Sequence, residues 1–332
     1  MDPYVLAILI VVFGLLFDYT NGFHDAANVV STVIATKVLK PLSAIVLACV
    51  LNTIGATNVS AVAQTITSGL VDSLAISQIT VLAALLGAIA WNFITWYFGI
   101  PSSSSYALVG GLIGATWQSV GPSEVIWKGV IFKVGIPMLL SPVIGYCMGL
   151  LLMKTLQKIL EKKRKENYLK LFGNFQIGSA SIVALAHGLN DAQKSMGIIT
   201  LGLFASNMII STTVPFWVVM SCAIVMGLGT ASGGVRIIKT VGFSITKLET
   251  VQGFAAEMSA SVVILIASCL GMPVSSTHMI VGSVTGVGAA NGIKSVRWEV
   301  MKKMAYAWIF TIPLSAIIAT IFSCLFSVFK VF

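Results

Sequence analysis

Two short motifs place a carboxylate beside other polar groups within apolar stretches of this sequence. Residues 22–28 read GFHDAAN and residues 188–194 read GLNDAQK, which aligns Asp25 with Asp191 and Asn28 with Lys194. Residues three apart share a helix face, so each pair is expected to face one space. Asp18 and Glu257 are further acids in apolar stretches. Buried charges are costly unless they are paired or bind ions, so the motifs predict an ion or substrate site; pairs that tie helices together are the alternative.

A second duplicated motif is rich in hydroxyl groups. Residues 101–110 read PSSSSYALVG and residues 273–282 read PVSSTHMIVG. Proline suits a helix start and lacks the amide hydrogen that an interior position needs. We therefore expect one helix to end before each proline and another to begin within the hydroxyl residues, where its free amide groups attract anions. The residues concerned are Ser103, Ser104, Ser105, Ser275, Ser276 and Thr277.

Together these groups suit an oxyanion and hard cations. Carboxylate, amide and hydroxyl oxygens are the ligands that hard cations take. Two aspartates would by themselves repel an anion, since each like-charge pair at about 4 Å costs on the order of 4 kcal/mol at an effective dielectric near 20. A bound cation, or a proton on one aspartate, would remove this repulsion. Anion binding and cation binding are therefore expected to favour each other.

The elements that position these motifs must lie in a membrane. Hydrophobic residues make up 57% of the 332 residues, charged residues only 9%, and the mean hydropathy is +0.97. Soluble domains carry roughly a quarter charged residues. Apolar stretches of about the length that crosses a bilayer as a helix recur along the whole chain. We expect an all-α polytopic membrane protein surrounded by lipid, with no removable signal peptide.

The basic residues indicate orientation. Sixteen of the twenty Lys and Arg residues lie in four connections, around residues 37–40, 154–170, 236–247 and 294–303. This bias is typical of the positive-inside rule and not of a nucleic-acid surface, so no nucleic acid is expected as a partner. It places a basic linker, residues 154–171, in the cytoplasm and both termini outside.

The duplicated motifs divide the chain into two halves, residues 1–153 and 172–332. The first half begins outside and ends inside, so it crosses the membrane an odd number of times. The second half then begins inside and ends outside, so it runs inverted relative to the first. Two inverted-topology repeats with broken helices or re-entrant helical hairpins that meet near the midplane are the architecture of secondary transporters. Open backbone at that depth must line a cavity or lie within protein.

These motifs and the basic linker together resemble the inorganic phosphate transporter family, which includes the mammalian sodium-phosphate symporters of solute carrier family 20 and bacterial low-affinity phosphate permeases. The resemblance covers essentially the whole chain. It implies sodium-coupled symport of inorganic phosphate across the plasma membrane, with sodium ions as coupling ions, no covalent cofactor and a homodimer. A proton-coupled permease, or one for sulfate or another tetrahedral oxyanion, remains the alternative.

The resemblance also implies site residues, matched position by position. The phosphate ligands would be Asp25, Asn28, Ser104, Ser105, Asp191, Lys194, Ser276 and Thr277. The sodium ligands would be Asp25, Asn28, Asn52, Ser103, Asn190, Asp191, Glu257 and Ser275.

Three positions depart from the family pattern. Asn52 is taken as the first-half counterpart of Glu257, where animal members resemble a glutamate. His24 replaces an asparagine, and Lys194 stands where the family pattern has asparagine. Lys194 is expected either to attract phosphate or to mimic a bound cation.

Two other function classes fit less well. An intramembrane hydrolase could use Ser, His and Asp, but a catalytic triad needs one asymmetric set of nucleophile, base and orienting residue, whereas both motifs here are duplicated. A passive anion channel would not need paired carboxylates in its path. The sequence therefore predicts a transporter and not an enzyme.

Overall fold

Helices form nearly all of the regular structure. The computed structural model describes residues 2–58, 61–161, 165–233 and 235–329. Within these ranges the β-structure is limited to one bridge between Val71 and Val125. The helices of the first half are α1 (Pro3–Ala35), α2 (Pro41–Ala56), α3 (Ala61–Ser68), α4 (Gln78–Phe98), α5 (Ser104–Ser119), η1 (Pro122–Glu124), α6 (Trp127–Gly129), η2 (Val130–Gly135) and α7 (Ile136–Leu160). Those of the second half are α8 (Lys165–Ala205), α9 (Phe216–Ser232), α10 (Val235–Phe243), α11 (Thr250–Cys269), α12 (Ser276–Ala290), η3 (Ile293–Ser295) and α13 (Trp298–Val328).

Several of these helices suit a bilayer. Six of the described helices are long and apolar enough to cross one, and there are eight such spans if the bent pairs α2–α3 and α9–α10 each count as one. A helix makes its backbone hydrogen bonds within its own segment, which is what a hydrocarbon environment requires. The prediction of an all-α polytopic membrane protein is confirmed.

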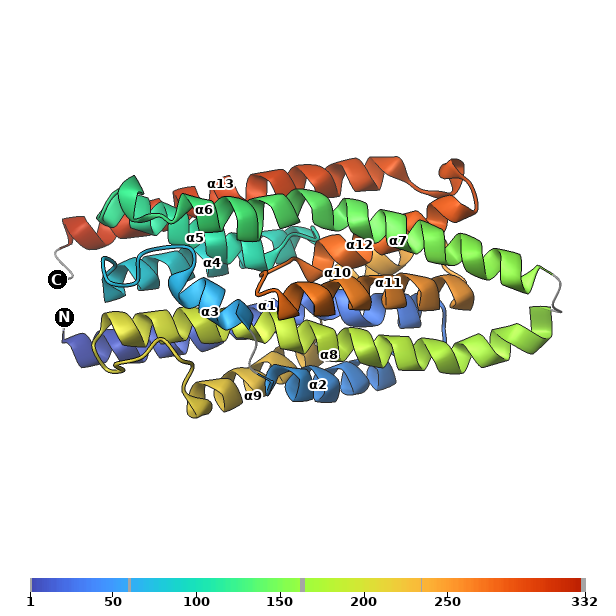
Figure 1. The fold of residues 1–332 in the computed structure, drawn as a ribbon, viewed down its shortest axis with the longest axis horizontal. Helices are drawn as coiled ribbons and strands as arrows, with labels where there is room; N and C mark the ends of the chain where they lie inside the picture. Colours follow the sequence, from blue (N-terminus) through green and yellow to red (C-terminus); the bar gives the residue numbers. More distant parts are fainter. Residues whose placement is uncertain (1, 59–60, 162–164, 234, 330–332) are drawn as a thin grey trace.

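The order of the elements repeats. Helices α1 to α5 and α7 are matched in sequence order by α8 to α12 and α13. Figure 1 shows that α1 starts at the end of the molecule where both termini lie, and that α8 runs back toward that end from the opposite one. This antiparallel course is the arrangement expected of inverted halves.

The four basic connections meet at the opposite end of the molecule. A cavity of about 590 Å³ there is lined by Lys37, Leu169, Lys247 and Arg297, one residue from each connection. The predicted linker is largely helical, because α7 continues to Leu160 and α8 begins at Lys165. Three of its basic residues, at positions 162–164, lie outside the described residues.

Each half contains a helical hairpin, α4–α5 and α11–α12. Gly99 ends α4 with φ 65°, and Gly271 follows α11 with φ 66°. Glycine adopts this left-handed conformation without the steric cost that other residues incur. Each of the two glycines lies two residues before its motif's proline, so the hairpin turns are duplicated with the motifs.

Close packing holds the second arm of each hairpin in place. α5 lies along α13, and α12 lies along α7. A Cβ atom on Gly114 would lie 2.2 Å from the Ala316 carbonyl oxygen, and one on Gly286 would lie 2.0 Å from that of Tyr146. Only a residue without a side chain allows such an approach.

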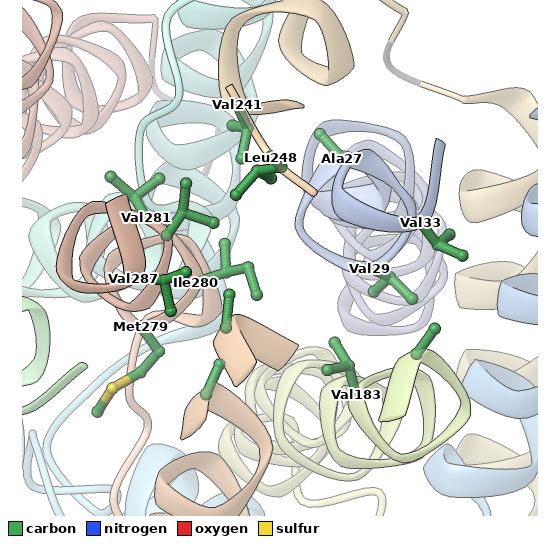
Figure 2. Packing of buried hydrophobic residues seen from close by; sticks show 14 of the residues in the cluster. Ala27, Val29, Val33, Val183, Val241, Leu248, Met279, Ile280, Val281 and Val287 are labelled. Carbon is green, nitrogen blue, oxygen red and sulfur yellow. The ribbon is translucent and has the colours of Figure 1, made fainter. Parts of the chain in front are cut away.

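An apolar core surrounds the C-terminal part of α1, toward the basic connections. Figure 2 shows small side chains of α1, such as Ala27 and Val29, near Val183 of α8, Val241 of α10 and Ile280 of α12. These residues are all buried. This packing positions the polar residues of α1, α8 and α12 described below.

Candidate functional site

The hairpin turns end in two capped helix starts. α5 begins at Ser104, and the Ser103 hydroxyl accepts a hydrogen bond from the Tyr106 amide at 3.3 Å. α12 begins at Ser276, and the Ser275 hydroxyl accepts one from the His278 amide at 3.2 Å. The prediction of new helices within both hydroxyl motifs is confirmed. Ser103 and Ser275 serve here as caps.

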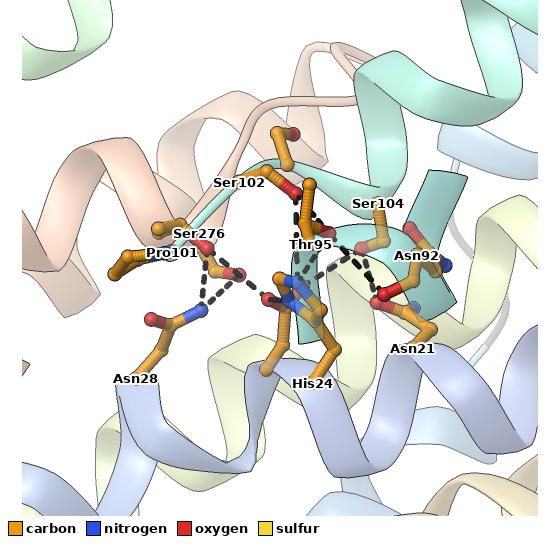
Figure 3. Close-up of polar contacts among 12 residues, drawn as sticks. Asn21, His24, Asn28, Asn92, Thr95, Pro101, Ser102, Ser104 and Ser276 are labelled. Carbon is orange, nitrogen blue, oxygen red and sulfur yellow. Dashed lines mark hydrogen bonds and ion pairs between the residues drawn. The ribbon is translucent and has the colours of Figure 1, made fainter. Parts of the chain in front are cut away.

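Helix α1 contacts both helix starts. The Asp25 carboxylate accepts hydrogen bonds from the Ser104 hydroxyl at 2.8 Å and from the Thr277 hydroxyl at 3.1 Å. The Asn28 amide donates to the Thr277 hydroxyl at 2.8 Å and to the Ser276 hydroxyl at 3.3 Å. Figure 3 shows Asn28 and His24 on α1 pointing toward the two hairpin turns. One face of α1 thus holds the turns of both halves.

Helix α8 contributes a charged pair. The Lys194 ammonium group contacts the Asp191 carboxylate, and it donates hydrogen bonds to the Ser105 hydroxyl at 2.5 Å and to the Val274 carbonyl oxygen at 2.8 Å. The His187 Nε2 atom lies 3.1 Å from the other Asp191 oxygen. An ammonium group has three hydrogens to donate, and these three acceptors use them all.

Asn28 in the first half and Lys194 in the second half make equivalent contacts. The aligned motifs pair Asn28 with Lys194 and Thr277 with Ser105. Asn28 donates to the Thr277 hydroxyl, and Lys194 donates to the Ser105 hydroxyl. The second half therefore holds an ammonium group where the first half holds a neutral amide. Because this ammonium group rests directly on Asp191, it occupies a position in which a cation could bind.

The two aspartates lie close together in a closed site. Ligand atoms of Asp25, His187 and Asp191 all lie within 4.8 Å of one another, and this group of residues could hold a metal ion. The three residues are at most 2% exposed, as are Asn28 and Lys194. Two carboxylates and one ammonium group give these side chains a charge of −1 when the imidazoles are neutral. The site is thus polar, anionic and shielded from solvent.

Three polar residues of the site were not among the site residues expected from the sequence. The Asn21 carboxamide oxygen accepts a hydrogen bond from the Ser104 hydroxyl, and His187 lies beside Asp191. Asn21 and His187 each lie four residues before their aspartate, so extending the aligned motifs by one helical turn would have found both. Thr95 was also missed, and its hydroxyl lies 3.1 Å from the His24 Nε2 atom.

Glu257 lies in a separate polar cluster. Its carboxylate accepts hydrogen bonds from Thr32 at 2.5 Å, from Gln176 at 3.2 Å and from the Ser179 hydroxyl. Glu257 is fully buried, and Thr32 lies seven residues beyond Asp25 on α1. The structure thus supplies three neutral groups for this carboxylate.

The remaining sodium candidates lie elsewhere. The Asn190 amide donates to the Ser268 hydroxyl at 2.7 Å and to the Met272 carbonyl oxygen at 3.3 Å. The Asn52 amide donates to the Thr230 hydroxyl at 2.8 Å. Asn52 lies on α2, whereas Glu257 lies on α11, which corresponds to α4. The pairing of Asn52 with Glu257 is therefore wrong.

Comparison with known proteins gives concordant matches. The sequence profile described as the phosphate transporter family matches residues 21–319. A protein of Bacillus subtilis (strain 168), named as a probable low-affinity inorganic phosphate transporter, is 44% identical over 320 residues, which cover 96% of each chain. One of Rhizobium meliloti (strain 1021) with the same name is 41% identical and covers 95% of each chain.

The fold also matches a solved structure. A structure described as "The sodium-dependent phosphate transporter" superposes with a TM-score of 0.88 at 24% identity, covering 98% of this chain and 99% of that one. At this identity the likeness concerns the fold.

Proposed function

The chain belongs to the phosphate transporter family, and we propose that it carries inorganic phosphate together with sodium ions through the site between α1, α8 and the two hairpin turns. It is a multi-pass membrane transporter and not an enzyme. The observation that carries the proposal is the meeting of Asp25 and Asp191 with two helix starts in a closed site.

The helix starts supply what an oxyanion needs. The first amide groups of α5 and α12 have no partner within their own helices and carry a partial positive charge. The hydroxyl groups of Ser104, Ser105, Ser276 and Thr277 lie at these starts and can turn from their present partners toward a ligand. We therefore assign phosphate to the space that these hydroxyl groups now fill, with Asn28 and Lys194 as further donors.

Charge counting supports a coupled cation. The site already carries a charge of −1, and phosphate adds one or two negative charges. Since like charges at about 4 Å repel by on the order of 4 kcal/mol at an effective dielectric near 20, phosphate binding needs a compensating cation or proton. Lys194 supplies one positive charge, so fewer mobile cations are needed than with two unpaired aspartates.

Sodium fits the oxygen atoms of Asp25 and Asn28. Ser103 and Ser275 accept the capping hydrogen bonds of the two helix starts. Asn190 and Asn52 donate through their amide nitrogens, whereas their carboxamide oxygens have no hydrogen-bond partner in the described part of the chain and stay candidates for sodium. The protein with the similar fold is described as sodium-dependent, which makes sodium the first cation to test. Glu257 is a candidate for a second ion, because its three partners all supply oxygen atoms that could turn toward a cation.

Orientation and assembly complete the proposal. We place the basic connections in the cytoplasm and both termini outside, by the positive-inside rule. The two halves, residues 1–153 and 172–332, would act as inverted repeats that give alternating access to the central site. The chain would function as a homodimer in the plasma membrane.

Proton coupling is the second candidate, and a specific observation favours it. Imidazole nitrogens lie 3.2 Å from Asp25 and 3.1 Å from Asp191, on His24 and His187. An imidazole ring can both donate and accept a proton, so each ring is placed to exchange one with its neighbouring carboxylate as phosphate binds.

Radiolabelled phosphate uptake into proteoliposomes tests both candidates. We expect an imposed inward sodium gradient to drive phosphate uptake and excess sulfate to compete poorly. Uptake under an imposed proton gradient is measured for comparison. Asp25→Asn should abolish uptake and serves as the inactive control. Uptake that is indifferent to sodium would overturn the sodium assignment, and equal competition by sulfate would overturn the choice of phosphate.

A further inference from the structure

Asp18 is a buried acid that the phosphate site does not use. It lies in the middle of α1 with no exposed surface, and its carboxyl oxygens form no hydrogen bond of ordinary geometry with the described residues. The Ser195 hydroxyl on α8 lies close enough to interact with it and likewise forms no hydrogen bond of ordinary geometry in the described part of the chain. Unpaired buried polar groups of this kind call for an explanation.

The surroundings of Asp18 are apolar. The titratable groups found to interact with it are Asp191 on α8 and Cys222 on α9. Cys222 belongs to an apolar cluster with Met196 and Ile199. An ionised carboxylate in such a place would be neither paired nor solvated, which is strongly unfavourable. A neutral carboxylic acid fits, because it can donate its proton to the Ser195 oxygen.

The same surroundings do not suit a metal ion. Hard cations take about six oxygen ligands. The side-chain hydroxyl found to interact with Asp18 is that of Ser195, and the carbonyl groups of helix interiors are already used in backbone hydrogen bonds. A proton is thus the ligand that fits this position.

Asp18 is placed to communicate with the phosphate site. It lies seven residues before Asp25, which in a helix is two turns and a rise of about 10 Å on the same face. It interacts electrostatically with Asp191 of the site. Its aligned position in the second half is Ala184, so Asp18 is not part of the duplicated phosphate motifs.

We propose that Asp18 is a proton-binding site coupled to phosphate transport. It holds a proton in the closed conformation and releases it to water when α1 moves relative to α8 and α9. A proton on Asp18 removes a negative charge near Asp191, so proton binding and phosphate binding favour each other, and by linkage the effect is reciprocal. The inference rests on the proposed transport of phosphate and adds to the proton-coupled candidate a carrier outside the phosphate motifs.

The test compares Asp18→Asn with the wild type in proteoliposomes that enclose a pH-sensitive dye. Asparagine has nearly the same shape and cannot release a proton. We expect the variant to lose phosphate-driven proton entry and the response of uptake to an imposed pH gradient. Exchange of internal for external phosphate at equal pH should persist, because it needs no net proton release. Glu299→Gln, an exposed acid at the start of α13, is the matched control and should behave as wild type.

The outcomes separate the two proposals. Proton entry that is unchanged in Asp18→Asn would overturn the assignment of Asp18, and so would loss of phosphate exchange in a variant that still folds. A wild type that takes up no phosphate under any gradient would instead overturn the proposed function. If Asp18→Asn does not fold, Ser195→Ala provides the test: it removes the hydroxyl that faces the acid and should shift the pH at which uptake is half-maximal. Phosphate has the same protonation states in the assays of the wild type and of Ser195→Ala, so its own titration cannot cause a difference between them. An unshifted pH profile in Ser195→Ala would therefore overturn the proposal.

Discussion

Replacing Lys194 with methionine removes the ammonium group and keeps a side chain of similar length. In the structure this group contacts Asp191, Ser105 and the Val274 carbonyl oxygen, and both Lys194 and Asp191 are fully buried. Removing one partner of a buried ion pair costs about 3–5 kcal/mol, because the other charge is left uncompensated. We therefore expect the free energy of unfolding to fall by this amount in sodium-free buffer.

Sodium should restore part of this loss if Lys194 occupies a cation position. An ion that binds only the folded state stabilises it by about 2.7 kcal/mol at one hundred times its dissociation constant. The Lys194→Met variant should thus gain more stability from sodium chloride than the wild type does. Choline chloride at equal ionic strength is the salt control.

Denaturant unfolding of the purified protein, followed by tryptophan fluorescence, measures both effects. The double variant Asp191→Asn/Lys194→Met removes both charges, so it should be less destabilised than Lys194→Met alone and should lack the extra response to sodium. If Lys194→Met is as stable as the wild type without sodium, the ion pair does not have the assigned role. If it is destabilised but sodium gives it no extra stability, the ammonium group does not stand in for a cation.

Further predictions concern the hairpin turns, the aspartates and the second cluster. Asp25→Asn and Asp191→Asn should each abolish phosphate uptake while the protein still elutes as a folded species in size-exclusion chromatography; near-normal uptake by either variant would remove that residue from the site. Gly286→Ala should lower the thermal unfolding midpoint, since its Cβ atom would lie 2.0 Å from the Tyr146 carbonyl oxygen, and an unchanged midpoint would contradict the packing described. Glu257→Gln should leave phosphate exchange intact but weaken the dependence of uptake on sodium concentration, and an unaltered sodium dependence would exclude Glu257 as an ion ligand.

The duplicated motifs predicted where the two hairpin turns end. A helix start is a local property of proline and hydroxyl residues, so the sequence placed helix starts within residues 103–105 and 275–277, and the structure has them at Ser104 and Ser276. The shared face of Asp25 and Asn28 is equally local, since it follows from helical spacing. The all-helical membrane fold followed from composition and from the length of the apolar stretches.

Contacts between distant segments could not be read in the same way. The partners of Glu257 come from α1 and α8, more than 70 residues away in sequence, and three neutral side chains carry no motif. Asn52 was paired with Glu257 from the resemblance to animal members of the family, which have a glutamate there, whereas the structure places the two residues on helices that do not correspond. The alignment of the duplicated motifs pairs residues of the two halves only close to the motifs themselves.

The two halves hold their hairpin turns by different means, and this difference bears on how the transporter can respond to ions. Thr277 at the start of α12 is held by a neutral amide and a carboxylate, from Asn28 and Asp25. Ser105 at the start of α5 is held by the ammonium group of Lys194. A mobile cation at Asp25 would compete with the hydroxyl group of Thr277 for the same oxygen, whereas Lys194 remains attached to the chain through every step. Cation binding at Asp25 should therefore act on the contacts of α1 with both helix starts, at Ser104 and Thr277, while the contact between α8 and α5 stays fixed. A duplicated site thus acquires ion-sensitive contacts at α1 and a fixed contact at α8 from a single exchange of asparagine for lysine.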